Sequence, residues 1–240
     1  SGFALTGVGR NPQEYPTVSI ENGIDGSRAI KLETKSTGQF GETVKMPIAA
    51  GNLFLGSFDV NNAVQKPLKA TRFGLPFGKK PLQLKGYYKY TPGTQPFKAK
   101  DKNGNTVTIP GQEDEGDIYA VLYEAAELDG KALDGNNVLT SKNIVALARV
   151  EVEKKDEFTA FHVDFHYGSR IPIDWPKFIQ DQRDPSDDGT GEYLPFKEEK
   201  MKNYEYNLAV VFTSSKYGAY FAGSVGSTLC IDKVEIVCEK

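Results

Sequence analysis

The sequence predicts an all-β protein in which two antiparallel sheets pack as a sandwich. Three observations predict it. Short apolar or alternating runs recur along the chain, turn dipeptides such as Asn22-Gly23 and Pro92-Gly93 separate them, and no sustained helical periodicity is present. Because sandwiches of 240 residues commonly form one domain, we expect residues 1–240 to be a single domain. Residues 1–27 are its N-terminal segment or, alternatively, the end of a linker from a preceding domain.

Nine segments have the apolar or alternating pattern of strands. They are residues 29–34, 43–48, 53–58, 83–90, 117–124, 144–151, 158–167, 205–213 and 228–237. One short helical turn is expected near residues 175–180.

The most informative segment runs from Arg72 to Gly93, where a Gly/Pro-rich turn leads into an aromatic, alternating strand. Successive side chains of a strand point to opposite faces. One face is expected in the core and carries Leu82, Leu84, Gly86, Tyr88 and Tyr90, whereas the solvent-facing side carries Gln83, Lys85, Tyr87 and Lys89.

Charge and hydropathy argue against a nucleic-acid partner and against a membrane-spanning helix. The chain has 29 basic and 32 acidic side chains and a net charge of −3, which argues against a nucleic-acid partner because phosphates require a basic face. No apolar run approaches the roughly 18 residues of a membrane-spanning helix.

Cys230 and Cys238 fall eight positions apart in the last predicted strand. This corresponds to about 26 Å, which is too far for a disulfide and predicts two free, mostly buried thiols.

The Arg72 to Gly93 segment is similar to a known family, together with three other stretches in the same order. These are GNLFLGSF at 51–58, DEGDIYAVLYEA at 114–125 and SSKYGAYFAGSVGSTLCIDKVEI at 214–236. They resemble the putative carbohydrate metabolism domain, which occurs mainly in surface and secreted proteins of gut Bacteroidetes. The resemblance implies a jelly-roll sandwich similar to carbohydrate-binding modules and a location outside the cytoplasm. It also implies non-catalytic glycan binding in polysaccharide utilisation; a glycoside hydrolase and a structural or adhesive module are the alternatives.

Two surfaces of such a sandwich offer residues for a glycan. On a sheet face, tyrosine rings stack against pyranose rings while charged groups bond hydroxyls; the candidates are Lys85, Tyr87, Tyr119, Tyr123, His162 and Asp164. The alternative is that these tyrosines cover a second apolar layer or a partner domain. In the long loop 169–203, Trp175 is a candidate stacking ring or, alternatively, a loop anchor that plugs the end of the core.

Hydrolysis would require two carboxyl groups about 5 to 9.5 Å apart, for which Asp117, Glu124 and Asp164 are the strand-borne candidates.

No cofactor is expected to be required. A structural calcium ion is an open possibility, with Asp232 and Glu21 or Asp25 as oxygen ligands. A partial calcium-loop pattern also starts at Asp184, but its last position is Pro195 instead of an acid, which favours a plain acidic loop.

Overall fold

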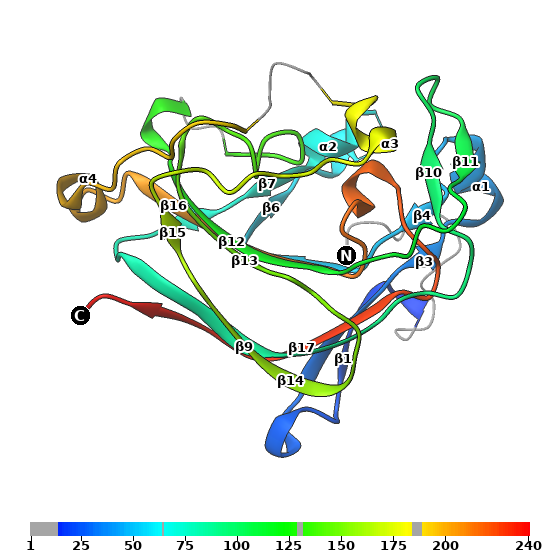
Figure 1. The fold of residues 1–240 in the computed structure, drawn as a ribbon, viewed down its shortest axis with the longest axis horizontal. Coiled ribbons are helices and arrows are strands. Elements are labelled where there is room, and N and C mark those ends of the chain that lie inside the picture. Colours follow the sequence, from blue (N-terminus) through cyan, green and yellow to red (C-terminus); the bar gives the residue numbers. More distant parts are fainter. Residues whose placement is uncertain (1–13, 64, 129–131, 184–188) are drawn as a thin grey trace.

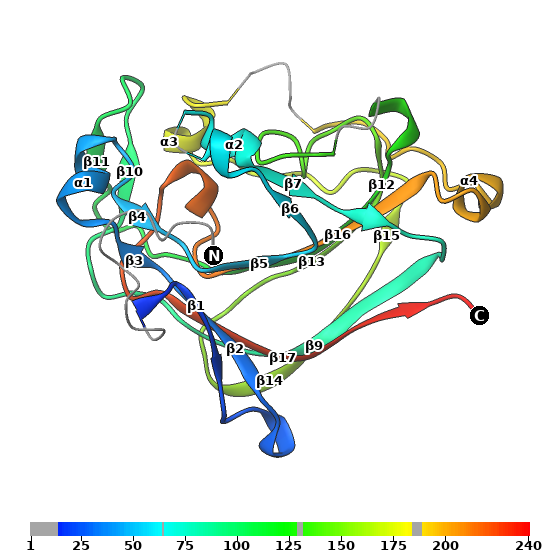
Figure 2. The same ribbon diagram turned by 180° about the vertical axis from the view of Figure 1, so that it is seen from behind.

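The computed structural model describes residues 14–63, 65–128, 132–183 and 189–240. Its long strands form two sheets, one above the other in Figures 1 and 2. The first sheet has the order β1 (Thr17–Ile20), β2 (Ala29–Glu33), β17 (Thr228–Cys238), β9 (Pro81–Thr91) and β14 (Lys155–Asp164). The second sheet has the order β15 (His166–Tyr167), β13 (Ile144–Val150), β12 (Asp117–Glu124), β16 (Tyr206–Thr213) and β5 (Asn52–Phe54), and β8 (Leu75–Pro76) also pairs with β16.

All neighbouring strands of the two sheets pair antiparallel. Strands from the two ends of the chain, β2 and β17, are neighbours in the first sheet, and the consecutive strands β14 and β15 belong to different sheets. This crossing between sheets gives the jelly-roll type of sandwich. The predicted fold class is confirmed.

Shorter elements extend the sandwich. Three two-stranded sheets pair β3 (Lys35–Ser36) with β4 (Ile48–Ala49), β6 (Gly56–Phe58) with β7 (Thr71–Phe73), and β10 (Lys98–Lys100) with β11 (Thr106–Thr108). The helices are α1 (Gly38–Thr43), α2 (Pro67–Ala70), α3 (Lys177–Gln180) and α4 (Glu198–Lys202), with 3₁₀ turns η2 (Ile24–Gly26), η3 (Val60–Asn62), η4 (Ala126–Leu128) and η5 (Gly218–Tyr220). In the described part of the chain, no helix has the length and apolar character to cross a membrane.

The main core fills the space between the two sheets. Strand β9 contributes Leu84, Tyr88 and Tyr90, all nearly inaccessible to solvent, as its alternation predicts. Leu82 is an exception, because it is exposed at the beginning of this strand. Burying each large apolar side chain contributes about 1.5 to 3 kcal/mol relative to leaving it exposed. The alternation of β9 therefore places one of its faces firmly in the core.

A second core covers the other face of the second sheet. Tyr119, Val121 and Tyr123 of β12 pack there against residues of a further layer that includes Phe73 and Leu133. In Figures 1 and 2 this layer contains β6, β7, α2 and α3, all on the side of the second sheet away from the first. All eight residues of β12 are consequently buried, as in sheets that are covered on both faces.

Three predicted strands differ from the structure. Residues 43–47 form no strand: α1 ends at Thr43, Lys45 has a left-handed backbone (φ 59°), and Ile48 is the first residue of β4. Residues 53–58 divide into β5 and β6, because Gly56 (φ 147°) turns the chain from β16 toward β7. Residues 158–167 likewise divide into β14 and β15. The six other strands and the short helical turn, now α3, are confirmed.

Cys230 is buried, Cys238 is half-buried, and both are free thiols, which confirms the prediction from their spacing. Burial raises the pKa of both thiols.

Candidate functional site

The predicted glycan-binding residues of the strands do not share one surface. Tyr87 and Lys85 lie on the outer face of the first sheet, where Lys85 pairs with His162 and Gln83 pairs with Asp164 in register. The Gln83 amide donates a hydrogen bond of 2.8 Å to Asp164. This part of the predicted surface is therefore assembled as expected.

Tyr119 and Tyr123 lie in the second sheet, so the expectation that they continue the surface around Tyr87 is wrong. They are 6% and 0% exposed, respectively, because the second core covers them. Tyr123 donates a hydrogen bond of 2.6 Å to the carbonyl oxygen of Phe73, which anchors the covering layer. The alternative interpretation, that these tyrosines support a second apolar layer, describes their packing.

The three candidate catalytic carboxylates also lie apart. Asp117 and Glu124 occupy opposite ends of β12, about 23 Å from each other at strand spacing, and Asp164 belongs to the other sheet. Glu124 bonds Lys200, whereas Asp117 accepts two hydrogen bonds from Arg149. These residues therefore do not form the pair that hydrolysis needs.

The carboxylates considered for calcium are bonded within the protein. Asp232 accepts hydrogen bonds from the Ser27 hydroxyl and from the backbone N–H groups of Ile24 and Lys233. Asp25 pairs with Lys233, and Glu21 pairs with Arg28. Across the described ranges, no three His, Cys, Asp or Glu side chains come close enough to share a metal ion. Residues 184–188, the core of the partial calcium-loop pattern, are outside the described residues.

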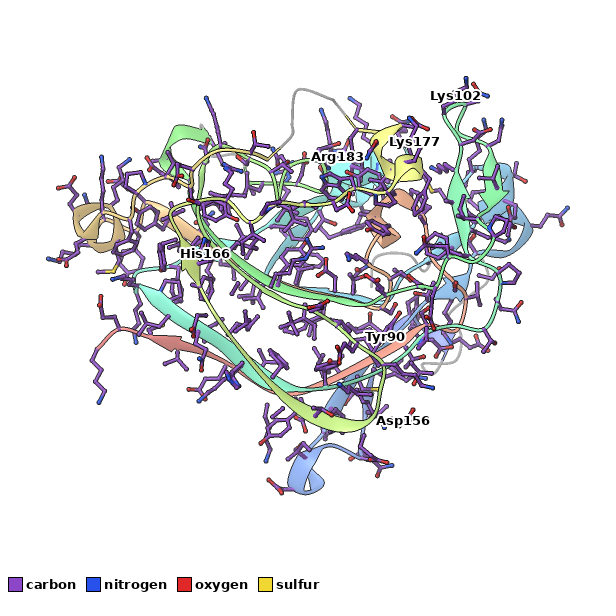
Figure 3. All side chains as sticks on the ribbon, in the orientation of Figure 1. Tyr90, Lys102, Asp156, His166, Lys177 and Arg183 are labelled. Carbon is purple, nitrogen blue, oxygen red and sulfur yellow. The ribbon has the colours of Figure 1, made fainter. Side chains whose placement is uncertain are left out.

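A large cavity opens at the Asp117 end of β12, between the two sheets and the beginning of the long loop. We call it the acidic cleft; it has a volume of about 670 Å³, and its walls are residues 113–117, 149–154 and 171–174 with Tyr90, Pro92 and Lys216. In Figure 3, Tyr90 of the lower sheet and Arg183 of the upper layer lie to the right of His166, which is toward the left end of the molecule. Seven carboxylate and three cationic side chains line the cleft.

Two buried acids form the inner wall of the acidic cleft. Asp117 is 3% exposed and is bound by Arg149 through Nε and one terminal nitrogen, at 3.0 and 2.7 Å. Asp114 accepts hydrogen bonds of 2.6 to 3.0 Å from the hydroxyls of Ser215 and Ser227 and from the backbone N–H groups of Ser224 and Glu115. Burial raises the pKa of Asp114 to about 6, although these hydrogen bonds oppose the shift.

The outer wall presents free polar groups. Glu113, Glu151 and Asp174 are exposed, and within the described residues none of their carboxylates has a hydrogen-bond or ion-pair partner. Lys216 pairs with Glu115 at 2.7 Å and lies 5.7 Å from the centre of the Tyr217 ring. The cleft therefore combines hydrogen-bond donors and acceptors on a surface that a ligand can reach.

A smaller cavity of about 80 Å³, the inner pocket, adjoins the acidic cleft and shares Asp117, Arg149 and Lys216 with it. Tyr119, Trp175, Arg183 and Tyr220 are among its other lining residues. The structure thus brings together three predicted site residues, namely Asp117, Tyr119 and Trp175.

Trp175 is not the open stacking ring that one interpretation expected. The Arg183 guanidinium lies 4.1 Å from the centre of the indole, and the rings of Tyr217 and Tyr220 lie 6.4 and 6.5 Å away. Trp175 and the two tyrosines belong to a small apolar cluster that also contains Ile179 of α3. The indole anchors the long loop and also borders the inner pocket.

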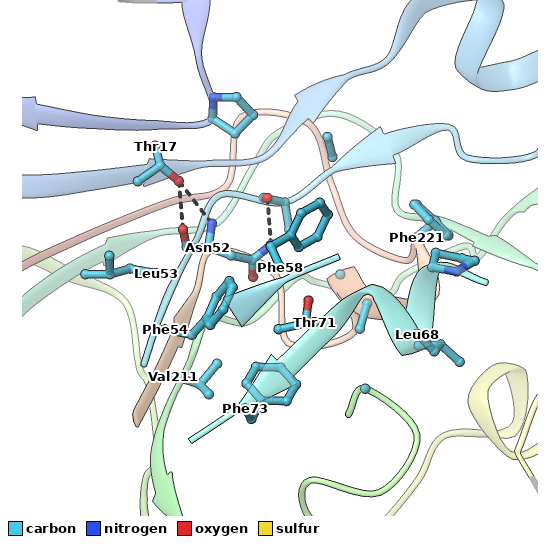
Figure 4. A pocket seen from close by; sticks show the side chains of 17 residues that line it. Thr17, Asn52, Leu53, Phe54, Phe58, Leu68, Thr71, Phe73, Val211 and Phe221 are labelled. Atoms are coloured by element: carbon cyan, nitrogen blue, oxygen red, sulfur yellow. Dashed lines mark hydrogen bonds between the residues drawn. The ribbon is translucent and has the colours of Figure 1, made fainter. Parts of the chain in front are cut away.

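A third cavity, of about 300 Å³, is mainly apolar (Figure 4). Phe54 and Phe73 meet edge to face at 5.5 Å in its wall, near Phe58 and Val211. The polar groups of Thr17 and Asn52 at its edge bond each other at 3.0 and 3.2 Å. This cavity offers few groups for a hydroxyl-rich ligand, so the acidic cleft is the stronger candidate site.

Reasoning from the sequence missed Arg149, Lys216 and Glu151 as residues of this site. One signal for Arg149 was present: a single arginine interrupts the apolar strand IVALARV, and a single aspartate begins the apolar strand DIYAVLYE. Opposite charges in two buried strands indicate an ion pair, because an unpaired buried charge is costly. Lys216 and Glu151 carried no comparable signal.

Comparisons with known proteins connect this fold to one family. A structure described as a putative glycoside hydrolase from Bacteroides thetaiotaomicron is 43% identical with a TM-score of 0.81; the alignment covers 100% of this chain but 61% of that chain. Another putative glycoside hydrolase, from Bacteroides vulgatus, is 37% identical with a TM-score of 0.78 and coverages of 99% and 83%. No curated protein matches. The family model described as Putative carbohydrate metabolism domain matches residues 1–237, and the chain belongs to this family.

Proposed function

We propose that the domain binds glycans without cleaving them and that the acidic cleft is the binding site. The observation that carries this proposal is the composition of one cavity: Arg149, Lys154 and Lys216 supply donors, and Glu151 and Asp174 supply acceptors. Sugar hydroxyls both donate and accept hydrogen bonds. The volume of about 670 Å³ lies within the roughly 300 to 1,000 Å³ that is usual for small-ligand sites. Membership of a carbohydrate-related family supports the same ligand class.

We further propose that the domain acts outside the cytoplasm in polysaccharide utilisation, on a secreted or surface-displayed protein. Its similarity to Bacteroides proteins described as putative glycoside hydrolases supports this location. Protease treatment of intact cells, followed by immunoblotting for the domain, tests it; a protected domain in intact cells and a digested one in lysed cells would contradict it.

Removing acceptors from the cleft is expected to weaken glycan binding. Glu151→Ala and Asp174→Ala should each reduce the affinity of array-identified glycans about tenfold or more, since a hydrogen bond to a charged group contributes about 1.5 to 3 kcal/mol. Titration calorimetry on the intact domain measures this effect. Glu199→Ala is the matched control, because Glu199 is exposed on α4 at the other end of the second sheet (Figure 1).

Tyr87→Ala distinguishes the cleft from the outer face of the first sheet. If this variant loses binding while both cleft variants keep it, the binding surface is the face that carries Tyr87, Lys85 and His162. If the array shows no retained glycan for the wild-type domain, the proposed function itself fails, and a structural or adhesive role becomes the better explanation.

Glycoside hydrolysis is the second candidate function, and one observation favours it. The exposed carboxylates of Glu113, Glu151 and Asp174 come from three different segments and line one cavity, as an acid and base pair would require. Product analysis of every retained glycan separates the two functions. Intact glycans after long incubation support binding alone, whereas released sugars that disappear with Glu151→Ala or Asp174→Ala support hydrolysis.

The charge of the cleft predicts its selectivity among glycans. With seven carboxylates against three cations, neutral or amine-bearing sugars are expected to bind at least tenfold more tightly than glucuronate- or sulfate-bearing analogues of the same length. The comparison is made in EDTA, so that no divalent ion bridges two anions. Equal affinity for neutral and acidic glycans at low salt would contradict the prediction.

A further inference from the structure

One residue that lines the inner pocket, Trp175, carries an unusual hydrogen-bond donor. The indole Nε1 of Trp175 is buried, and it is the one buried side-chain nitrogen or oxygen without a hydrogen-bond partner among the residues that the structure describes. A buried donor without a partner destabilises a fold, and most such groups are satisfied in native proteins. Trp175 is one of the residues that line the inner pocket, and this pocket shares Asp117, Arg149 and Lys216 with the acidic cleft.

The face of the indole is covered by Arg183, so the N–H group on its edge is the part that can interact with a ligand. Arg183 stacks on the ring at 4.1 Å and is itself fixed by hydrogen bonds to the Tyr220 hydroxyl at 2.8 Å and to the Thr140 hydroxyl at 3.2 Å. The Gln180 amide donates to the backbone carbonyl of Trp175 at 2.6 Å. A ring that is held on its face by a cation is poorly placed to stack on a sugar, but its N–H remains fixed in position.

The inner pocket is also lined by a hydrogen-bond acceptor, the carboxylate of Asp117. Asp117 uses both carboxylate oxygens to bind Arg149, and each carboxylate oxygen can accept more than one hydrogen bond. The volume of about 80 Å³ holds only a few water-sized groups, which is enough for a substituent of a sugar but not for its ring. A hydroxyl is the small group that can accept from an indole N–H and donate to a carboxylate at the same time.

We propose that Trp175 Nε1 is a specificity-determining donor that bonds one hydroxyl of the bound sugar. This hydroxyl enters the inner pocket while the sugar ring occupies the acidic cleft. The inference rests on the proposed function and narrows its ligand class. Sugars with a free hydroxyl or hydroxymethyl group at the inserted position bind, and their deoxy analogues are rejected. A site that pairs its buried polar groups with a ligand hydroxyl discriminates strongly against the analogue that lacks it.

The indole N–H provides a direct measurement, because Trp175 is the only tryptophan in the chain and gives a single indole resonance. The probes are glucose, galactose, mannose and xylose, each compared with deoxy sugars that lack one hydroxyl, titrated at millimolar concentration into the ¹⁵N-labelled domain. At least one parent sugar is expected to shift the indole resonance in a saturable manner, and one of its deoxy analogues is expected not to. A resonance that no sugar shifts would overturn the inference.

Replacing the N–H alone provides the second test. Benzothienylalanine at position 175 keeps the fused rings and exchanges N–H for sulfur, and Trp175→Phe is a simpler companion. The benzothienyl protein should bind the parent sugar about tenfold more weakly, bind the deoxy analogue with unchanged affinity, and have a melting temperature at or above that of the wild type. If the role of Trp175 is only structural, its replacement should instead lower the melting temperature and weaken the binding of both sugars equally.

The outcomes separate this inference from the proposed function. One outcome is that sugars bind the wild-type domain with an affinity that the cleft variants reduce, while the benzothienyl protein keeps the same preference for the parent sugar. In that case only the proposed role of Trp175 is wrong. If no glycan or monosaccharide binds the wild-type domain, the proposed function fails and this role fails with it.

Discussion

Arg149→Met is expected to lower the free energy of unfolding by about 3 kcal/mol or more. Removing the guanidinium leaves the carboxylate of Asp117 buried, with 4% of its side chain exposed, and without its cationic partner. Breaking one side of a buried pair commonly costs about 3 to 5 kcal/mol, since the remaining charge has lost its hydration as well as its partner. Urea denaturation of the free domain at pH 7 measures the change.

The double variant Asp117→Asn/Arg149→Met shows whether the loss comes from the unpaired charge. It should recover at least about 1 kcal/mol relative to Arg149→Met, because neither charge remains in the core. The surface pair of Lys85 and Glu235, with side chains 42% and 58% exposed, is the matched control. Breaking it with Lys85→Met should change stability by less than about 1 kcal/mol. Single and double losses that simply add would contradict the interpretation of a buried pair.

Local alternation predicted the strands well but could not predict what covers them. In β9 the alternation describes the structure, because one face meets the core and the other meets solvent. Tyr119 and Tyr123 show the same kind of alternation, yet a layer built from Phe73, Leu133 and other distant residues buries them. Period-two patterns report which side chains share a face, whereas burial of the second face depends on contacts between segments far apart in sequence.

The candidate site shows the same limit. Asp117, Tyr119 and Trp175 were each identifiable as residues with useful chemistry, but their common position at the inner pocket follows from the docking of the long loop onto the end of β12. The interrupted strands have a related cause. Gly56, with φ 147°, and the change of sheet after Asp164 depend on partner strands that the local sequence does not identify.

Asp114 is expected to make the stability of the domain depend on pH, with a sign opposite to that of most carboxylates. Its folded pKa of about 6 lies above the ordinary aspartate value of 3.8, because its burial disfavours the charged form. Between these two values the folded protein binds more protons than the unfolded chain, so this contribution to stability increases as the pH falls from 7 to 4. At about 1.4 kcal/mol for each pKa unit, the full change is on the order of 3 kcal/mol.

Asp114→Asn removes this titration, so the comparison uses the difference in unfolding free energy between wild type and variant at pH 7, 6, 5 and 4. The difference should change in favour of the wild type by about 2 to 3 kcal/mol as the pH falls, whatever the variant costs at pH 7. Asp59→Asn is the matched control. Hydrogen bonds from the side chain of Asn62 and the backbone of Asn61 lower the pKa of Asp59, so its stabilising contribution is lost as the pH falls. A pH-independent difference for Asp114→Asn would mean that its four donors hold the carboxylate ionised despite its burial.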